Sequence, residues 1–164
     1  LSGVPSGFDK LDKLTSGWQP SDLIIIAARP GMGKTALTLS MAKNMAVNHN
    51  IPVAFFSCEM SSVQLITRLI SSETGLSSEK LRTGKLEKHE WEQLNVKVKA
   101  LEKAPLFIDD TPSLSIFDLR AKARRLASQH GIKMIVIDYL QLMLSLIQIR
   151  RCRRRGRCRS RRTT

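Results

Sequence analysis

The sequence predicts an α/β fold with helices on both faces of a mostly parallel sheet, the doubly wound arrangement. Four short apolar runs lack polar alternation, which is typical of strands that are buried on both faces. Between these runs lie segments in which apolar residues recur at helical spacing. This alternation of strand and helix favours parallel strands that are joined by crossover helices.

The four expected strands are rich in Ile, Val and Phe. They comprise Leu23–Ala27, Val53–Phe56, Leu106–Ile108 and Met134–Ile137. The longest unbroken apolar run, residues 23–28, is far shorter than the roughly 20 residues that a membrane-spanning helix needs. We therefore expect no membrane span.

Three segments between these runs are expected to be helical because their apolar residues share one face. The apolar sets are Leu37, Met41 and Met45; Trp91, Leu94, Val98 and Leu101; and Ile116, Leu119, Ala123 and Leu126. Ser61 and Gln64 have the spacing of a capping box. Ser115 can cap the last helix, and Gly131 stands where a left-handed C-terminal residue is favoured. The polar stretch 75–88 is expected to connect two helices on one side of the sheet.

The positive charge of the chain is concentrated at its C-terminal end. The net charge is +13, but nine arginines lie in residues 150–164, where there is no acidic residue, and the rest of the chain has a net charge of only +4. We therefore expect no basic nucleic-acid-binding face on the globular part. We expect one domain at residues 1–143 and an arginine-rich tail at 144–164. The tail could bind phosphates, but the lack of stacking aromatic residues among its arginines favours a disordered segment or a shifted reading frame.

Cysteine usage indicates a reducing compartment. Residues 1–143 contain only Cys58, so this part cannot form an internal disulfide, and a cytoplasmic location is expected. Cys152 and Cys158 have no histidine near them and match no usual zinc-binding spacing. Because the sequence opens on Leu1 rather than on methionine, we expect the native N-terminus to lie further upstream.

The strongest functional motif is residues 29–35, Arg-Pro-Gly-Met-Gly-Lys-Thr, between the first expected strand and the first expected helix. This is the context of a phosphate-binding loop, in which glycines let backbone N–H groups turn toward a polyphosphate and the helix N-terminus adds its dipole. Lys34 can reach the β- and γ-phosphates, and Thr35 can bind Mg²⁺. The strict G-x-x-x-x-G-K-[ST] pattern requires glycine where this chain has Ala28, but that position need only precede the turn.

Asp138 follows the fourth expected strand, so its carboxylate should emerge at the carboxyl edge of the sheet, where the phosphate loop also lies. There it can hold Mg²⁺ through a water molecule opposite Thr35, as a Walker B aspartate does. Its alternative role is to cap a helix. We expect Thr35 and Asp138 to form the metal site. The full set expected to bind nucleotide is Ala28, Arg29, Pro30, Gly31, Met32, Gly33, Lys34, Thr35 and Asp138.

Glu59 follows the second expected strand, and a carboxylate at that place can orient or deprotonate the water that attacks the γ-phosphate. Its alternative role is that of a first-turn acid before the helix at Ser61. We expect Glu59 and Lys34 to be the catalytic residues. Asp109 and Asp110 precede a Thr-Pro-Ser sequence and are expected to be turn residues rather than catalytic ones.

Five segments resemble one protein family. They are residues 7–12 (GFDKLD), 15–18 (TSGW), 27–35 (AARPGMGKT), 56–60 (FSCEM) and 138–143 (DYLQLM). Together they resemble the ATPase domain of bacterial replicative DNA helicases, the DnaB-type branch of the RecA-like family. The resemblance covers about residues 1–143.

The resemblance implies a RecA-like P-loop NTPase with Glu59 as the catalytic glutamate and Asp138 as the Walker B residue, and this family also departs from glycine at the position of Ala28. It implies ATP and Mg²⁺ as cofactors and a homohexameric ring that hydrolyses ATP between subunits. Such rings translocate on single-stranded DNA and unwind the duplex ahead. Primase and a helicase loader would be partners of regions outside this sequence.

The family also has parts that are not recognisable here. After the run that corresponds to 138–143 come further strands, one of them inside the sheet, DNA-contacting loops, a γ-phosphate sensor and an arginine finger. We therefore expect a sheet that is incomplete on the C-terminal side and a 164-residue chain that is inactive by itself. Two alternatives stay open: a non-catalytic remnant that binds nucleotide weakly or nucleic acid through its tail, and a RecA-like recombination or signalling ATPase.

Overall fold

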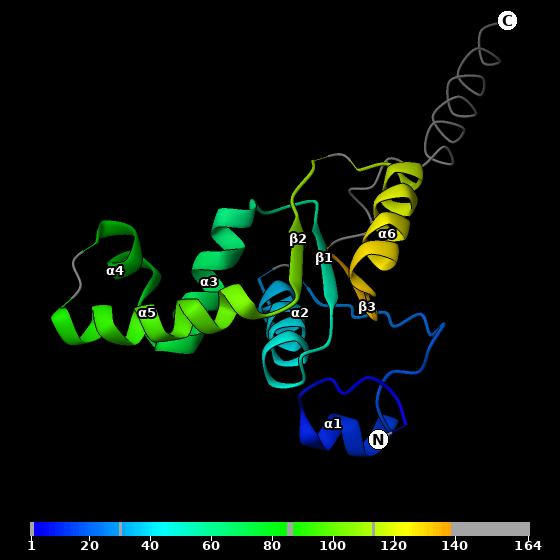
Figure 1. The fold of residues 1–164 in the computed structure, drawn as a ribbon, viewed down its shortest axis with the longest axis horizontal. Helices are drawn as coiled ribbons and strands as arrows, with labels where there is room; N and C mark the ends of the chain where they lie inside the picture. Colours follow the sequence, from blue (N-terminus) through cyan, green and yellow to red (C-terminus); the bar gives the residue numbers. More distant parts are fainter. Residues whose placement is uncertain (1, 30, 85–86, 113, 139–164) are drawn as a thin grey trace, which may run out of the picture.

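The computed structural model describes residues 2–29, 31–84, 87–112 and 114–138. Within these residues a sheet is formed by the parallel strands β1 (Val53–Ser57), β2 (Leu106–Asp109) and β3 (Met134–Asp138), in the order β2-β1-β3 (Figure 1). Three of the four expected strands and their parallel arrangement are therefore confirmed. Pro30, both tail cysteines and the arginine-rich tail 144–164 lie outside the described residues.

Helices cover both faces of this sheet. They are α1 (Asp9–Thr15), α2 (Lys34–Lys43) with the π-helical turn η1 (Asn44–Asn48), α3 (Ser62–Thr74), α4 (Ser78–Thr83), α5 (Lys88–Lys103) and α6 (Ile116–His130). The alternating side chains of β1, all buried, divide the core into two clusters. Phe55 packs with α2 and α3, and Phe56 packs with Leu119 of α6. The doubly wound arrangement predicted from the sequence is confirmed.

The predicted helix caps are present. The Ser61 hydroxyl accepts a hydrogen bond from the Gln64 N–H at 3.4 Å, and the Ser115 hydroxyl accepts one from the Asp118 N–H at 3.1 Å. Gly131 ends α6 with φ of 63°, in the left-handed region. These caps fix where α3 and α6 begin, directly after the carboxyl ends of β1 and β2.

Two short helices were not predicted. α1 lies in the N-terminal segment, and α4 lies within residues 75–88, which were expected to be only a connection. Helices of this length contain too few turns for an apolar period to be visible in the sequence. α4 is instead defined by its ends, Ser77 as N-cap and Gly84 as a left-handed C-cap.

The prediction of a buried strand at Leu23–Ala27 is wrong. The segment has no strand assignment, and the side chains of Leu23 and Ile25 are 86% and 80% exposed. An extended segment becomes a strand only if a neighbour supplies a hydrogen-bonding ladder, and the described strands do not pair with it. β3 stays at the edge of the sheet, where Ile135 is 42% exposed. The apolar pattern was present, but the ladder partner that it needs is not local.

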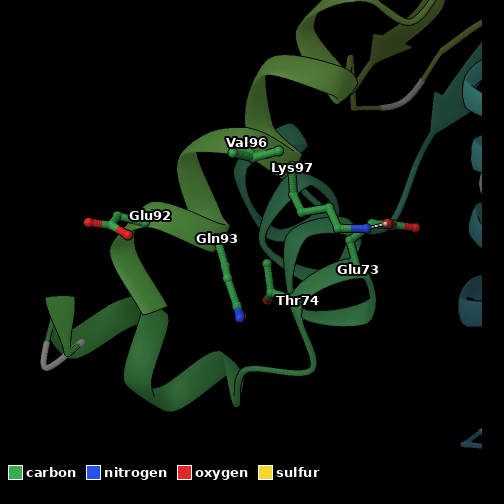
Figure 2. A pocket seen from close by; sticks show the side chains of 6 residues that line it. All are labelled: Glu73, Thr74, Glu92, Gln93, Val96 and Lys97. Atoms are coloured by element: carbon green, nitrogen blue, oxygen red, sulfur yellow. Dashed lines mark hydrogen bonds and ion pairs between the residues drawn. The ribbon is translucent and has the colours of Figure 1, made fainter. Parts of the chain in front are cut away.

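The helices α3, α4 and α5 form an arm beside the sheet, and α4 and the start of α5 project away from it (Figure 1). A pocket of about 320 Å³ lies between α3 and α5 (Figure 2). Its lining residues are Glu73, Thr74, Glu92, Gln93, Val96 and Lys97.

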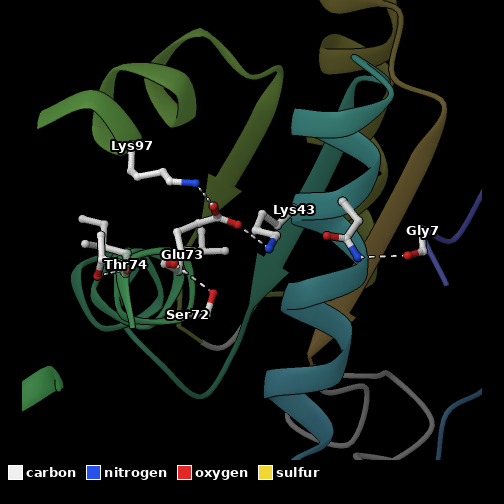
Figure 3. Close-up of polar contacts among 9 residues, drawn as sticks. Gly7, Lys43, Ser72, Glu73, Thr74 and Lys97 are labelled. Carbon is white, nitrogen blue, oxygen red and sulfur yellow. Dashed lines mark hydrogen bonds and ion pairs between the residues drawn. The ribbon is translucent and has the colours of Figure 1, made fainter. Parts of the chain in front are cut away.

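Glu73 connects this arm to the helix that follows the phosphate loop (Figure 3). Its carboxylate is 2.5 Å from Lys43 Nζ of α2 and 3.4 Å from Lys97 Nζ of α5. The hydrogen bond from Lys43 outweighs the effect of burial and holds the pKa of Glu73 below its usual value of 4.5. The ion pairs therefore stabilise the fold at pH values above that usual value, and this stabilisation is lost as the pH falls through the lowered pKa.

We expect Glu73→Gln to lower the free energy of unfolding by about 1 kcal/mol at neutral pH, because the two lysines lose a charged partner in a half-buried position. The difference from wild type should shrink in acid, where the wild-type carboxylate is protonated. Urea unfolding at neutral and acidic pH measures both values. The control is Glu102→Gln, since Glu102 is exposed on α5 and has no ion pair among the described residues. A difference that is the same at both pH values would contradict the assignment.

Candidate functional site

The predicted phosphate loop turns at two glycines. Gly31 and Gly33 have φ values of +77° and +82°, in the left-handed region that favours glycine. A Cβ atom at either position would meet nothing within 4 Å, so the requirement is conformational and the concave side of the loop is open. α2 begins at Lys34, directly after Gly33. The first N–H groups of the helix, which have no partner inside it, therefore lie at the loop, as an anion site requires.

Other members of the predicted loop are at the surface. Ala28, Arg29 and Met32 are exposed. The N–H of Met32 donates to the carbonyl of Arg29 at 3.2 Å, which closes the turn.

The carboxylate of Asp138 joins the phosphate loop to the end of β3. One of its oxygens, Oδ1, lies 3.0 Å from Lys34 Nζ, and the other, Oδ2, accepts a hydrogen bond from Thr35 Oγ1 at 2.6 Å. Asp138 is only 2% exposed. Two residues that are 103 positions apart in the chain thus meet at the carboxyl edge of the sheet, where the sequence placed them.

This arrangement fits a Mg²⁺ ion that is shared with a nucleotide. The hydroxyl of Thr35 and the carboxylate of Asp138 are oxygen ligands of the kind that Mg²⁺ prefers. No cluster of three or more His, Cys, Asp or Glu side chains that could hold a metal occurs among the described residues. A magnesium ion at this place would complete its shell with water and phosphate oxygens, which is its usual habit.

Glu59 lies at the same edge of the sheet. It follows β1 directly and is exposed, and the N–H of its neighbour Cys58 donates to the carbonyl of Asp138 at 2.8 Å. In the part of the chain that the structure describes, the Glu59 carboxylate forms no hydrogen bond or ion pair. α3 begins only at Ser62 and has no acidic residue in its first turn, so the alternative role of a first-turn acid is not supported. The carboxylate can therefore bind a water molecule.

The neighbouring acidic residues have other partners. Asp109 accepts hydrogen bonds from the Thr111 N–H at 3.0 Å and from Lys122 Nζ at 2.6 Å, as expected of a turn residue. Burial would raise the pKa of Asp109, but the hydrogen bonds from Lys122 and Thr111 lower it overall. Asp110 accepts from the N–H of Ser62 at 2.7 Å. Neither carboxylate is available to activate water.

Sequence reasoning missed two features of this edge. Burial and the nearby carboxylates of Asp138 and Asp109 raise the pKa of the Cys58 thiol, so this cysteine stays protonated and unreactive. Ser57, the last residue of β1, forms hydrogen bonds to the backbone of Met60. A serine at the end of an apolar run carries no sign of what its hydroxyl contacts, so the sequence offered no signal for this role.

The pocket in Figure 2 contains none of the residues that were predicted to bind nucleotide. An open phosphate loop is bounded by backbone N–H groups rather than by apolar walls, so we place the site at the carboxyl edge of the sheet and not in this pocket. Among the described residues, no helix has the length and apolar character needed to cross a membrane.

Comparisons with known proteins agree with this geometry. The model of the DnaB-like helicase C-terminal domain matches residues 3–159. The replicative DNA helicase DnaB of Geobacillus stearothermophilus is 50% identical over 143 residues, which are 87% of this chain and 32% of that protein. The replicative DNA helicase DnaC of Bacillus subtilis is 44% identical over 143 residues, with the same coverage. The chain thus spans about a third of the length of these relatives.

Solved structures show the same fold. A helicase ATPase domain superimposes with a TM-score of 0.82 at 32% identity, over 88% of this chain and 52% of that one. A DnaB-like replicative helicase, whose structure was determined to study its interactions with primase, superimposes with a TM-score of 0.80 at 33% identity. That match covers 87% of this chain and 35% of the other. The predicted RecA-like α/β fold is confirmed.

Proposed function

Because the chain belongs to the DnaB-like helicase C-terminal domain family, we propose that it is the ATP-hydrolysing part of a replicative DNA helicase. In this proposal a homohexameric ring couples ATP hydrolysis to movement along single-stranded DNA and to unwinding of the duplex. The observation that carries the proposal is the contact of Asp138 with both Lys34 and Thr35. This contact brings a phosphate-binding lysine, a magnesium-binding hydroxyl and a Walker B carboxylate to one place.

We propose ATP and Mg²⁺ as the cofactors of this site. The open N–H groups of the loop at Gly31 and Gly33 would hold the β-phosphate, and Lys34 would turn from Asp138 toward the γ-phosphate. Thr35 and Asp138 would hold the metal, Asp138 through water. When bound, Mg²⁺ neutralises charge on the phosphate oxygens. Glu59, which has no partner among the described residues, would accept a proton from the attacking water.

We also propose partners for the assembled ring. DNA is its substrate, and primase and a helicase loader are its protein partners, in line with the structural relative whose title names primase. The single cysteine of residues 1–143 favours the cytoplasm as the place where it acts.

The proposal is tested by Glu59→Gln in the 164-residue chain. We expect nucleotide affinity to be nearly unchanged, because the Glu59 side chain is exposed and does not contact the phosphate loop residues Lys34 or Thr35. Hydrolysis should slow by about 10²- to 10⁴-fold, because a carboxamide cannot accept a proton. The assay is single turnover, with enzyme in excess over labelled ATP, since we propose that a neighbouring subunit completes the site in the ring and the isolated chain will turn over slowly.

The matched control is Glu92→Gln, which changes an exposed glutamate on α5, remote from the phosphate loop. It should leave both binding and hydrolysis at wild-type values. Hydrolysis by Glu59→Gln at the wild-type rate would remove Glu59 from the mechanism.

A further inference from the structure

The loop that carries Glu59 is closed by one buried side chain. Ser57 is 2% exposed, and its hydroxyl donates to the carbonyl of Met60 at 2.7 Å and accepts from the N–H of Met60 at 3.1 Å. Both polar groups of Met60 are thus bound to the residue at which β1 ends. The hydroxyl connects the two ends of residues 58–60, and Glu59 is the middle residue of that segment.

The same loop is fixed to both neighbouring strands. On one side, the N–H of Cys58 donates to the carbonyl of Asp138 in β3 at 2.8 Å. On the other side, Asp110, which follows β2, accepts from the N–H of Ser62 at 2.7 Å. The hydrogen bond from Ser62 holds the pKa of Asp110 below its usual value, so this carboxylate stays charged at the start of α3. The backbone on both sides of Glu59 is therefore anchored.

The Glu59 side chain has no comparable anchor, because it forms no hydrogen bond or ion pair within the described residues. Its direction is set by the backbone alone. A general base must lie within hydrogen-bond reach of the water that it deprotonates, and small misplacements lower rates strongly. The loop geometry must then do the positioning that a direct partner does in other sites.

We propose that Ser57 is a positioning residue, whose hydroxyl holds residues 58–60 in the conformation that directs Glu59 at the water attacking the γ-phosphate. The inference rests on the proposed catalytic role of Glu59. Alanine at this position removes both hydrogen bonds to Met60, whereas threonine keeps a hydroxyl and adds one methyl group.

The first test measures Ser57→Ala in the full 164-residue chain. We expect nucleotide affinity to stay near wild type and single-turnover hydrolysis to slow by about 10- to 100-fold. Ser57→Thr should recover much of the lost rate. The matched control is Ser71→Ala, because Ser71 is also half-buried or more and donates its hydroxyl to a backbone carbonyl, that of Leu76, away from the loop. A fall in affinity together with the rate, or an equal effect of the control, would overturn the proposal.

A double-mutant cycle separates this inference from the proposed function. In the Glu59→Gln background, Ser57→Ala should have no further effect on hydrolysis, because there is no base left to position. If the two effects multiply, Ser57 acts independently of Glu59 and the inference fails while the catalytic role of Glu59 stands. If Glu59→Gln alone leaves the rate unchanged, it is the proposed catalytic role that fails.

Amide hydrogen exchange gives a readout that does not depend on hydrolysis. The Met60 N–H should exchange more slowly than the Glu59 N–H, which has no acceptor in the described part of the chain. In Ser57→Ala the Met60 N–H should exchange about tenfold faster or more, while the amides of β1 keep their wild-type rates. An unprotected Met60 N–H in the wild type would refute the hydrogen bond. Faster exchange throughout β1 would show a general loss of stability instead of a positioning effect.

Discussion

Lys34→Ala is expected to abolish measurable nucleotide binding by the chain. The Lys34 ammonium is the positive group that the structure places against the Asp138 carboxylate, at 3.0 Å, on the first residue of α2. Without it the triphosphate would approach a 2% exposed carboxylate that has lost its cation. Removing one partner of such a buried charged pair typically costs about 3–5 kcal/mol. The affinity should therefore fall by at least about 100-fold, since each 1.4 kcal/mol is about tenfold.

The measurement is a titration with a fluorescent ATP analogue in the presence of Mg²⁺. Lys133→Ala is the matched control, because Lys133 is exposed, precedes β3 and has no ion pair among the described residues. Circular dichroism shows whether each variant is folded. A folded Lys34→Ala protein that binds nucleotide with wild-type affinity would move the phosphate site elsewhere in the molecule.

The parts of this site that the sequence predicted correctly are those that depend on local pattern and on the edge rule for parallel sheets. Runs such as Val53–Phe56 and Met134–Ile137 are buried strands because nothing in them is polar enough to face water. Once both are parallel, Asp138 must leave the sheet at the edge where α2 begins, and its contact with Thr35 follows from that geometry.

The wrong and missing parts depend on partners that are remote in the chain. The segment Leu23–Ala27 has the composition of a strand, but only a neighbouring strand can make it one, and its composition does not say which. Asp110 was predicted to be a turn residue, and its bond to the N–H of Ser62 depends on how β1 and β2 are paired. Side-chain anchors of this kind appear only when the register of the sheet is known.

Asp138→Asn is expected to change the role of magnesium in nucleotide binding. In the wild type both carboxylate oxygens are engaged, one with Lys34 and one with Thr35, so a phosphate must compete with Asp138 for the lysine. An asparagine has one acceptor oxygen and no charge, so Lys34 is released toward the phosphates and the repulsion between carboxylate and triphosphate disappears. At an effective dielectric constant of about 20, two unit charges about 4 Å apart interact with about 4 kcal/mol, so a small part of this repulsion is enough for about tenfold in affinity.

We therefore expect ATP without magnesium to bind Asp138→Asn more tightly than wild type, by about tenfold. Addition of Mg²⁺ should strengthen binding to the wild type but not to the variant, and single-turnover hydrolysis in Mg²⁺ should fall by about 100-fold or more, because the carboxylate that would hold the metal through water is gone. Titrations with the fluorescent analogue in EDTA and in Mg²⁺ measure the first two effects independently of hydrolysis. Asp109→Asn is the matched control, since Asp109 ends the neighbouring strand β2 but is paired with Lys122 and should leave the magnesium dependence intact. If Asp138→Asn needs magnesium for binding as much as the wild type does, Asp138 does not hold the metal, and its contacts with Lys34 and Thr35 serve only to order the empty loop.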